Sequence, residues 1–123
     1  MNPTWSFVYE DGLWLPHRTP AASENLLRAV ETLIVAIGRR SDDVQEFLEA
    51  WDELSAQPDY RISTTAATLR PVDDDKVEMM DKYGQFQNVQ IPVDELRDAL
   101  NALANTMDEQ PETSIGPRFP PLP

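Results

Sequence analysis

The chain carries few residues that could build a catalytic or metal-binding centre. His17 is its single histidine and it has no cysteine, so a metal site with two or more His or Cys ligands cannot form. No serine lies in the G-x-S-x-G sequence of a hydrolase nucleophile elbow. The four glycines are far apart, so no glycine-rich loop is available to hold a phosphate group. We therefore predict a protein that is not an enzyme and that uses no cofactor or metal.

Carboxylates are the abundant reactive groups, with 22 Asp and Glu against 10 Lys and Arg. One cluster, residues 73–75 followed by Glu78, offers the oxygen ligands that suit Ca²⁺. It lacks the alternating ligands, the central glycine and the closing glutamate of a calcium-binding loop. We interpret this cluster as a solvated turn.

The most informative pattern is a run of acids between Asp42 and Asp59 that contains no Lys or Arg. Most of these acids lie at helical spacing, opposite an apolar stripe that includes Phe47, Trp51 and Leu54. Like charges four residues apart destabilise an isolated helix by roughly 0.2–0.5 kcal/mol per pair, and no basic residue relieves that cost here. The acids are Asp42, Asp43, Glu46, Glu49, Asp52, Glu53 and Asp59.

This acidic face has two interpretations. It could simply keep the protein soluble, or it could be a docking surface for a cationic partner, whose association an acidic patch can accelerate by about 10–10³. A second acidic stretch, from Asp73 to Asp81 and interrupted only by Lys76, favours the docking surface. Among the aromatic residues, Trp14 and Tyr83 lie near predicted turns and could be exposed interface anchors. The predicted partner-binding residues are Glu46, Glu49, Asp52, Glu53, Asp74, Trp14 and Tyr83.

Two helices are expected to carry this face, after an N-terminal β-hairpin. Alternation around Trp5 and an Asp-Gly turn predict a hairpin over residues 4–15, ended by Pro16. The first helix is predicted to start at Thr19-Pro20 and to end at a left-handed C-cap, Gly38. The second is predicted to begin with a capping box at Asp43, and the short connection favours an antiparallel helical hairpin.

The remaining elements are three strands and a helix. Strands are predicted at 60–69, 77–80 and 87–91, with a turn at 71–75, followed by a helix over 94–107. The order predicts an α+β fold, with an antiparallel sheet packed against the helical hairpin and a third, C-terminal helix. We expect a single domain over residues 1–108 and a Pro-rich, partly polyproline-like tail over 109–123.

Composition excludes several classes of protein. The chain is 41% hydrophobic and 26% charged, which is typical of a globular domain. A formal net charge of −12 argues against direct binding of a nucleic-acid backbone. No export signal or membrane-spanning run is apparent, so we expect a cytoplasmic protein without a membrane partner.

Residues 77–96 form a distinctive sequence of motifs. A strand leads to Tyr83-x-x-Phe86, then to a Val-x-Ile-Pro segment at 89–92, and then to Asp-Glu-Leu at 94–96, which opens the last helix. This arrangement resembles a pattern found in small bacterial immunity proteins, which neutralise polymorphic toxins, including those of contact-dependent growth inhibition. The resemblance covers about a sixth of the chain and implies no particular toxin-contacting residue.

Together these observations predict an immunity protein that binds a cognate toxin with a basic surface, expected to be a nuclease. The mechanism would be stoichiometric occlusion of the toxin's active or substrate-binding site by a monomer in a one-to-one complex. One alternative is an acidic nucleic-acid mimic that inhibits a DNA-binding enzyme. Another is a non-catalytic adaptor subunit, whose Pro117-x-x-Pro120 segment could be a peptide ligand. A small-ligand protein or enzyme would instead need a convergent pocket with strongly perturbed carboxylates.

Overall fold

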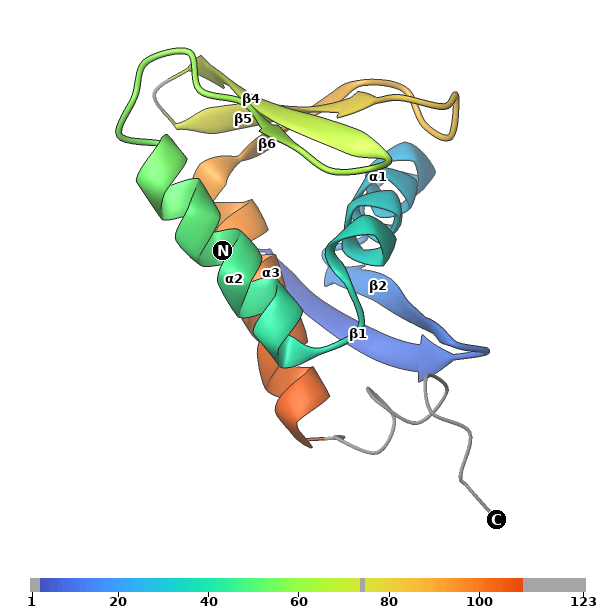
Figure 1. Cartoon of the computed structure of the whole chain (residues 1–123). Coiled ribbons are helices and arrows are strands. Elements are labelled where there is room, and N and C mark those ends of the chain that lie inside the picture. Colours follow the sequence, from blue (N-terminus) through green and yellow to red (C-terminus); the bar gives the residue numbers. More distant parts are fainter. Residues whose placement is uncertain (1–2, 74, 110–123) are drawn as a thin grey trace.

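The fold has two antiparallel sheets and three helices, in a computed structural model that describes residues 3–73 and 75–109. The four-stranded sheet and the β1–β2 hairpin lie at opposite ends of the molecule, with α1 between them (Figure 1). The α+β class predicted from the sequence is confirmed. In chain order the elements are β1 (Thr4–Glu10), β2 (Leu13–Thr19), α1 (Glu24–Ile37), α2 (Ser41–Leu54), β3 (Ile62–Ser63), β4 (Ala67–Asp73), β5 (Lys76–Asp81), β6 (Val89–Pro92) and α3 (Val93–Glu109).

The β1–β2 hairpin is longer than predicted. β2 continues through Pro16, which lies opposite Phe7, and ends at Thr19. A two-stranded sheet has only edge strands, and an edge strand tolerates a proline that cannot donate a hydrogen bond. The alternation predicted for β1 holds, because Trp5 and Phe7 are buried on its inner face.

Helix α1 begins four residues later than the Thr19-Pro20 signal predicted. Ser23 is the N-cap, and its hydroxyl accepts a hydrogen bond from the Leu26 amide at 3.1 Å. The helix ends at Gly38, as predicted, but with φ 141° and ψ −174° instead of the left-handed helical values. A Cβ atom at this position would lie 2.3 Å from Asp43 Oδ2, so the close approach of the α2 N-terminus requires glycine here.

Helix α2 packs chiefly along α3 and makes little contact with α1. The two helices are antiparallel, since Ser41 donates to Asp108 at 2.5 Å near one end of the pair and Arg97 pairs with Asp52 at the other. The closely packed antiparallel pair is therefore α2 with α3, which β3–β6 separate in the chain, and not the predicted hairpin of α1 with α2. A short connection between α1 and α2 keeps their ends close but does not fix the angle between them.

The first predicted strand of the larger sheet is in fact a tight hairpin of β3 and β4. The Thr64 hydroxyl stabilises its turn by accepting from the Ala67 amide at 3.0 Å. β4 then passes through the predicted turn at Pro71, which pairs with Val77, and a bulge follows before Asp73. The sheet order is β3-β4-β5-β6.

One hydrophobic cluster joins both sheets and all three helices. α3 contributes its completely buried face, which follows the predicted helical periodicity of Leu96, Leu100 and Leu103. At its N-terminus Glu95 accepts a hydrogen bond from the Trp5 indole at 2.9 Å and lies 3.0 Å from Arg18 Nε. This carboxylate therefore ties α3 to the β1–β2 hairpin.

None of the helices in residues 3–73 and 75–109 combines the length and the apolar character that a membrane span needs. The predicted Pro-rich tail lies outside the described residues apart from Glu109.

Candidate partner-binding surface

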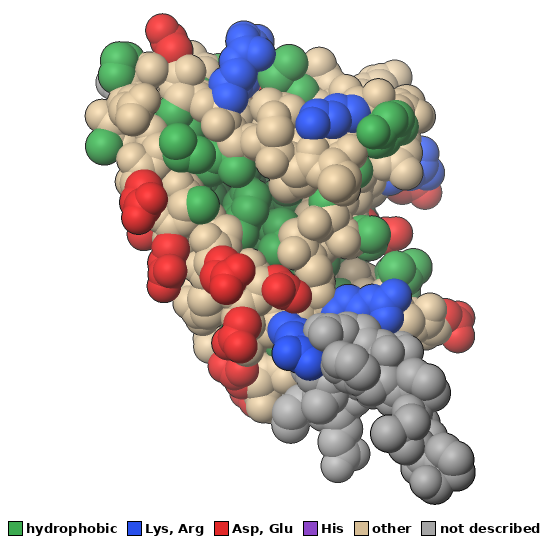
Figure 2. Space-filling model, in the orientation of Figure 1, with side chains coloured by type: hydrophobic (Ala, Val, Ile, Leu, Met, Phe, Trp, Pro, Cys, Tyr) green, Lys and Arg blue, Asp and Glu red, His purple; other side chains and the backbone are tan. Residues whose placement is uncertain are grey.

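The solvent side of α2 gathers four of the predicted contact residues. Glu46, Glu49, Asp52 and Glu53 are all exposed, while Val44, Leu48 and Trp51 on the opposite side are buried. Figure 2 shows the acidic side chains as a row along the position of α2. Helical spacing predicted a shared face for Asp42, Glu46, Glu49 and Glu53, and these side chains are all exposed, as is Asp52. We call this set the α2 acidic face: Asp42, Glu46, Glu49, Asp52 and Glu53.

Most of this negative charge is not neutralised within the described part of the chain. Asp52 pairs with Arg97, but Glu46, Glu49 and Glu53 form no ion pair with any residue in 3–73 or 75–109. Exposed carboxylates without a cationic neighbour attract an external cationic surface over a distance of about a Debye length, ~8–10 Å at physiological salt.

An apolar hollow borders the acidic face between α2, the end of α1 and the β3–β4 turn. Its volume is about 470 Å³, and its apolar base comes from Ala36, Ile37 and Phe47. Figure 2 shows apolar side chains at the surface beside the acidic row. We call this hollow between α2, the end of α1 and the β3–β4 turn the Phe47 hollow. It is lined by Ala36, Ile37, Asp43, Glu46, Phe47, Ser63, Thr64 and Thr65.

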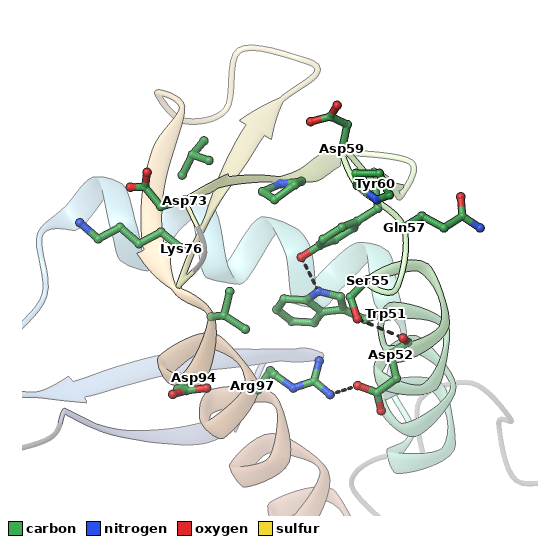
Figure 3. A pocket seen from close by; sticks show the side chains of 14 residues that line it. Trp51, Asp52, Ser55, Gln57, Asp59, Tyr60, Asp73, Lys76, Asp94 and Arg97 are labelled. Atoms are coloured by element: carbon green, nitrogen blue, oxygen red, sulfur yellow. Dashed lines mark hydrogen bonds and ion pairs between the residues drawn. The ribbon is translucent and has the colours of Figure 1, made fainter.

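A larger polar cleft lies at the C-terminal end of α2, where it meets β4, β5 and α3 (Figure 3). Trp51 lies at its centre and donates its indole N–H to the Tyr60 hydroxyl at 3.0 Å. The Arg97 guanidinium stacks on the Trp51 ring, 4.9 Å from its centroid, and also pairs with Asp52. The cleft has a volume of about 680 Å³ and is lined by Trp51, Asp52, Ser55, Gln57, Pro58, Asp59, Tyr60, Pro71, Val72, Asp73, Lys76, Val93, Asp94 and Arg97.

The charges in the polar cleft suit a cationic group better than an anion. Asp59, Asp73 and Asp94 line it, whereas Lys76 is the one basic group there besides the already paired Arg97. No group of three or more His, Asp or Glu residues in the described ranges is placed to hold a metal ion. The cleft therefore continues the negative character of the α2 acidic face.

Trp14 is not an exposed anchor, contrary to the prediction. Its side chain is 2% exposed because it lies on the inner face of the β1–β2 hairpin, opposite Tyr9. The two rings meet edge to face, with centroids 5.2 Å apart. A position next to a turn therefore did not imply exposure, because strand alternation continues through Trp14 to Pro16.

Tyr83 is exposed, at 73%, on the loop between β5 and β6. This loop is held firmly, since Asn25 of α1 donates to the Gln87 carbonyl at 2.9 Å and accepts from the Gln87 amide at 2.8 Å. Tyr83 lines neither the Phe47 hollow nor the polar cleft, so its role as an anchor stays a prediction. Asp74 lies outside the described residues.

Sequence reasoning missed Arg97, Tyr60 and the hydroxyl side of the Phe47 hollow. Arg97 is 45 residues from its partner Asp52, and Thr65 is near the hollow only because β3 and β4 form a tight turn. No local pattern of residues indicates either arrangement. Comparison of the chain with family models, with curated proteins and with solved structures found no match.

Proposed function

We propose that this chain is a bacterial immunity protein that binds a toxin with a basic surface and neutralises it. It acts without catalysis or a cofactor, as a cytoplasmic monomer in a one-to-one complex that occludes the toxin's active or substrate-binding site. The observation that supports this proposal best is the α2 acidic face, of which only Asp52 is paired with a basic residue among those described, and which the Phe47 hollow borders. A basic nuclease is the expected toxin, since the cations that hold its nucleic-acid substrate would pair with these carboxylates.

The two parts of this surface have different physical roles. Exposed carboxylates accelerate encounter with a cationic surface and orient it, but solvent-exposed pairs contribute little free energy each. Lasting affinity comes from side chains that leave water at the centre of an interface, surrounded by a polar rim. The half-buried ring of Phe47, next to exposed Glu46, provides such a centre and rim on one helix.

The Phe47 hollow favours an immunity protein over a nucleic-acid mimic as the function of this chain. A mimic needs carboxylates spaced like phosphates, and an apolar base beside them adds nothing to that resemblance. A mimic would also bind many DNA-binding enzymes, whereas an immunity protein binds one cognate. This difference can be measured.

The direct test of binding is co-expression of the tagged chain with the C-terminal region of the protein encoded immediately upstream. We expect both chains to be recovered together in a one-to-one complex that survives purification. A set of unrelated basic nucleases tested in the same way should not be retained. Failure to recover any complex would contradict the proposal, and retention of the unrelated nucleases would favour the mimic.

A further inference from the structure

We infer that the Phe47 hollow receives an apolar side chain of the partner protein, flanked in the partner by a Lys or Arg that pairs with Glu46. This inference rests on the proposed function, because it specifies how the same surface recognises its partner. It identifies the partner's binding segment by its chemistry: a bulky apolar residue beside a basic one.

The base of the hollow is apolar and firmly supported. Phe47 and Ile37 are half-buried, so part of each side chain stays in contact with water. The Phe47 ring lies edge-on against Trp51, with centroids 6.3 Å apart, and Trp51 is 1% exposed. Trp51 is held in turn by its hydrogen bond to Tyr60. An apolar surface that is partly exposed to solvent favours binding of an apolar side chain, because contact between the two removes apolar area from water.

The rim of the hollow selects for positive charge next to that apolar side chain. Two carboxylates line it, and the Asp43 carboxylate is partly buried, with its Oδ2 accepting from the Arg40 amide at 3.2 Å. Glu46 is exposed and forms no ion pair with the described residues. On the other side lie hydroxyl groups, of which Thr64 is engaged in the β3–β4 turn. Glu46 is therefore the more accessible of the two carboxylates at this mouth.

Three short peptides test this chemistry on the full chain without any toxin. The first consists of lysines and leucines, the second replaces the leucines with serine, and the third replaces the lysines with glutamate. Binding is followed by amide chemical shifts in NMR spectra. We expect the lysine–leucine peptide to bind about tenfold more tightly than either of the others, which corresponds to ~1.4 kcal/mol. The shifts should concentrate at the residues that line the hollow.

Substitutions in α1 provide a matched pair of variants. Ile37→Ser removes an apolar group from the hollow, whereas Val35→Ser makes a similar apolar-to-hydroxyl change at an exposed valine that does not line it. We expect Ile37→Ser to weaken the lysine–leucine peptide about threefold to tenfold and Val35→Ser to leave its affinity unchanged. Phe47→Ala, checked for folding by circular dichroism, should weaken it further.

Other results would overturn the inference. Equal binding of the lysine–serine peptide would show that charge alone is recognised. Shifts that avoid the hollow, equal effects of the two serine variants, or no binding at all would show that the hollow is not a recognition site. These outcomes are independent of the co-expression test, in which a complex can form through another surface.

Discussion

The double substitution Glu46→Lys with Glu49→Lys is expected to slow association with the basic partner about tenfold or more at low ionic strength. It removes two exposed carboxylates that pair with no residue in the described part of the chain, and puts two cations on the α2 acidic face. Electrostatic steering changes association rates by about 10–10³, and it acts before any contact forms. Stopped-flow mixing measures the rate directly.

The salt dependence of that rate is the sharper readout. The natural chain should associate more slowly as salt is added, because salt screens exposed charges, and the double variant should lose most of this slope. The matched control is Glu10→Lys with Glu31→Lys, which changes the net charge equally at positions that line neither the Phe47 hollow nor the polar cleft. Equal slowing by both double variants would mean that only net charge matters, contrary to a specific α2 acidic face.

Replacement of Glu95 by alanine is expected to lower the free energy of unfolding by about 3 kcal/mol. The Glu95 side chain is 8% exposed, and its Oε2 atom accepts from the Trp5 indole and pairs with Arg18. Alanine would leave the buried indole N–H and the guanidinium without this partner, and an uncompensated buried charge is costly. Urea unfolding followed by circular dichroism measures the loss.

Two further variants separate the contacts of Glu95 with Trp5 and Arg18 from the general stabilisation that a negative charge gives to the N-terminus of a helix. Asp94→Ala removes an exposed carboxylate from the same first turn of α3 and should cost less than about 1 kcal/mol. Glu95→Gln keeps an acceptor for the indole without the charge and should fall between the two alanine variants. A cost for Asp94→Ala as large as that for Glu95→Ala would contradict the assigned role. Because α3 also carries Arg97, a loosened α3 start should disturb the polar cleft.

The sequence predicted the parts of the fold that depend on local periodicity. The acidic and apolar sides of α2 follow from helical spacing, and the inward face of β1 follows from alternation. Element boundaries were less accurate where two signals competed. Thr19-Pro20 has the composition of a helix start, yet Thr19 is used by β2, and the N-cap is Ser23.

The shape of the binding surface could not be predicted, because it depends on how distant segments pack. The Phe47 hollow combines the end of α1, one turn of α2 and the β3–β4 turn, and each looks unremarkable alone in the sequence. From the sequence alone, Ile37 is predicted to be an ordinary core residue at the end of an apolar helix. The packing of α2 along α3 likewise brings together helices that β3–β6 separate in the chain, so no local pattern of residues predicts it.

Growth of bacteria that express the upstream protein's C-terminal region, with and without this chain, tests the proposed function most directly. The toxin fragment alone should stop growth, and co-expression of the natural chain should restore it. The Glu46→Lys and Glu49→Lys variant should restore growth less well at equal expression. A toxic fragment that the natural chain fails to neutralise, or a fragment without toxicity, would contradict the assignment as an immunity protein.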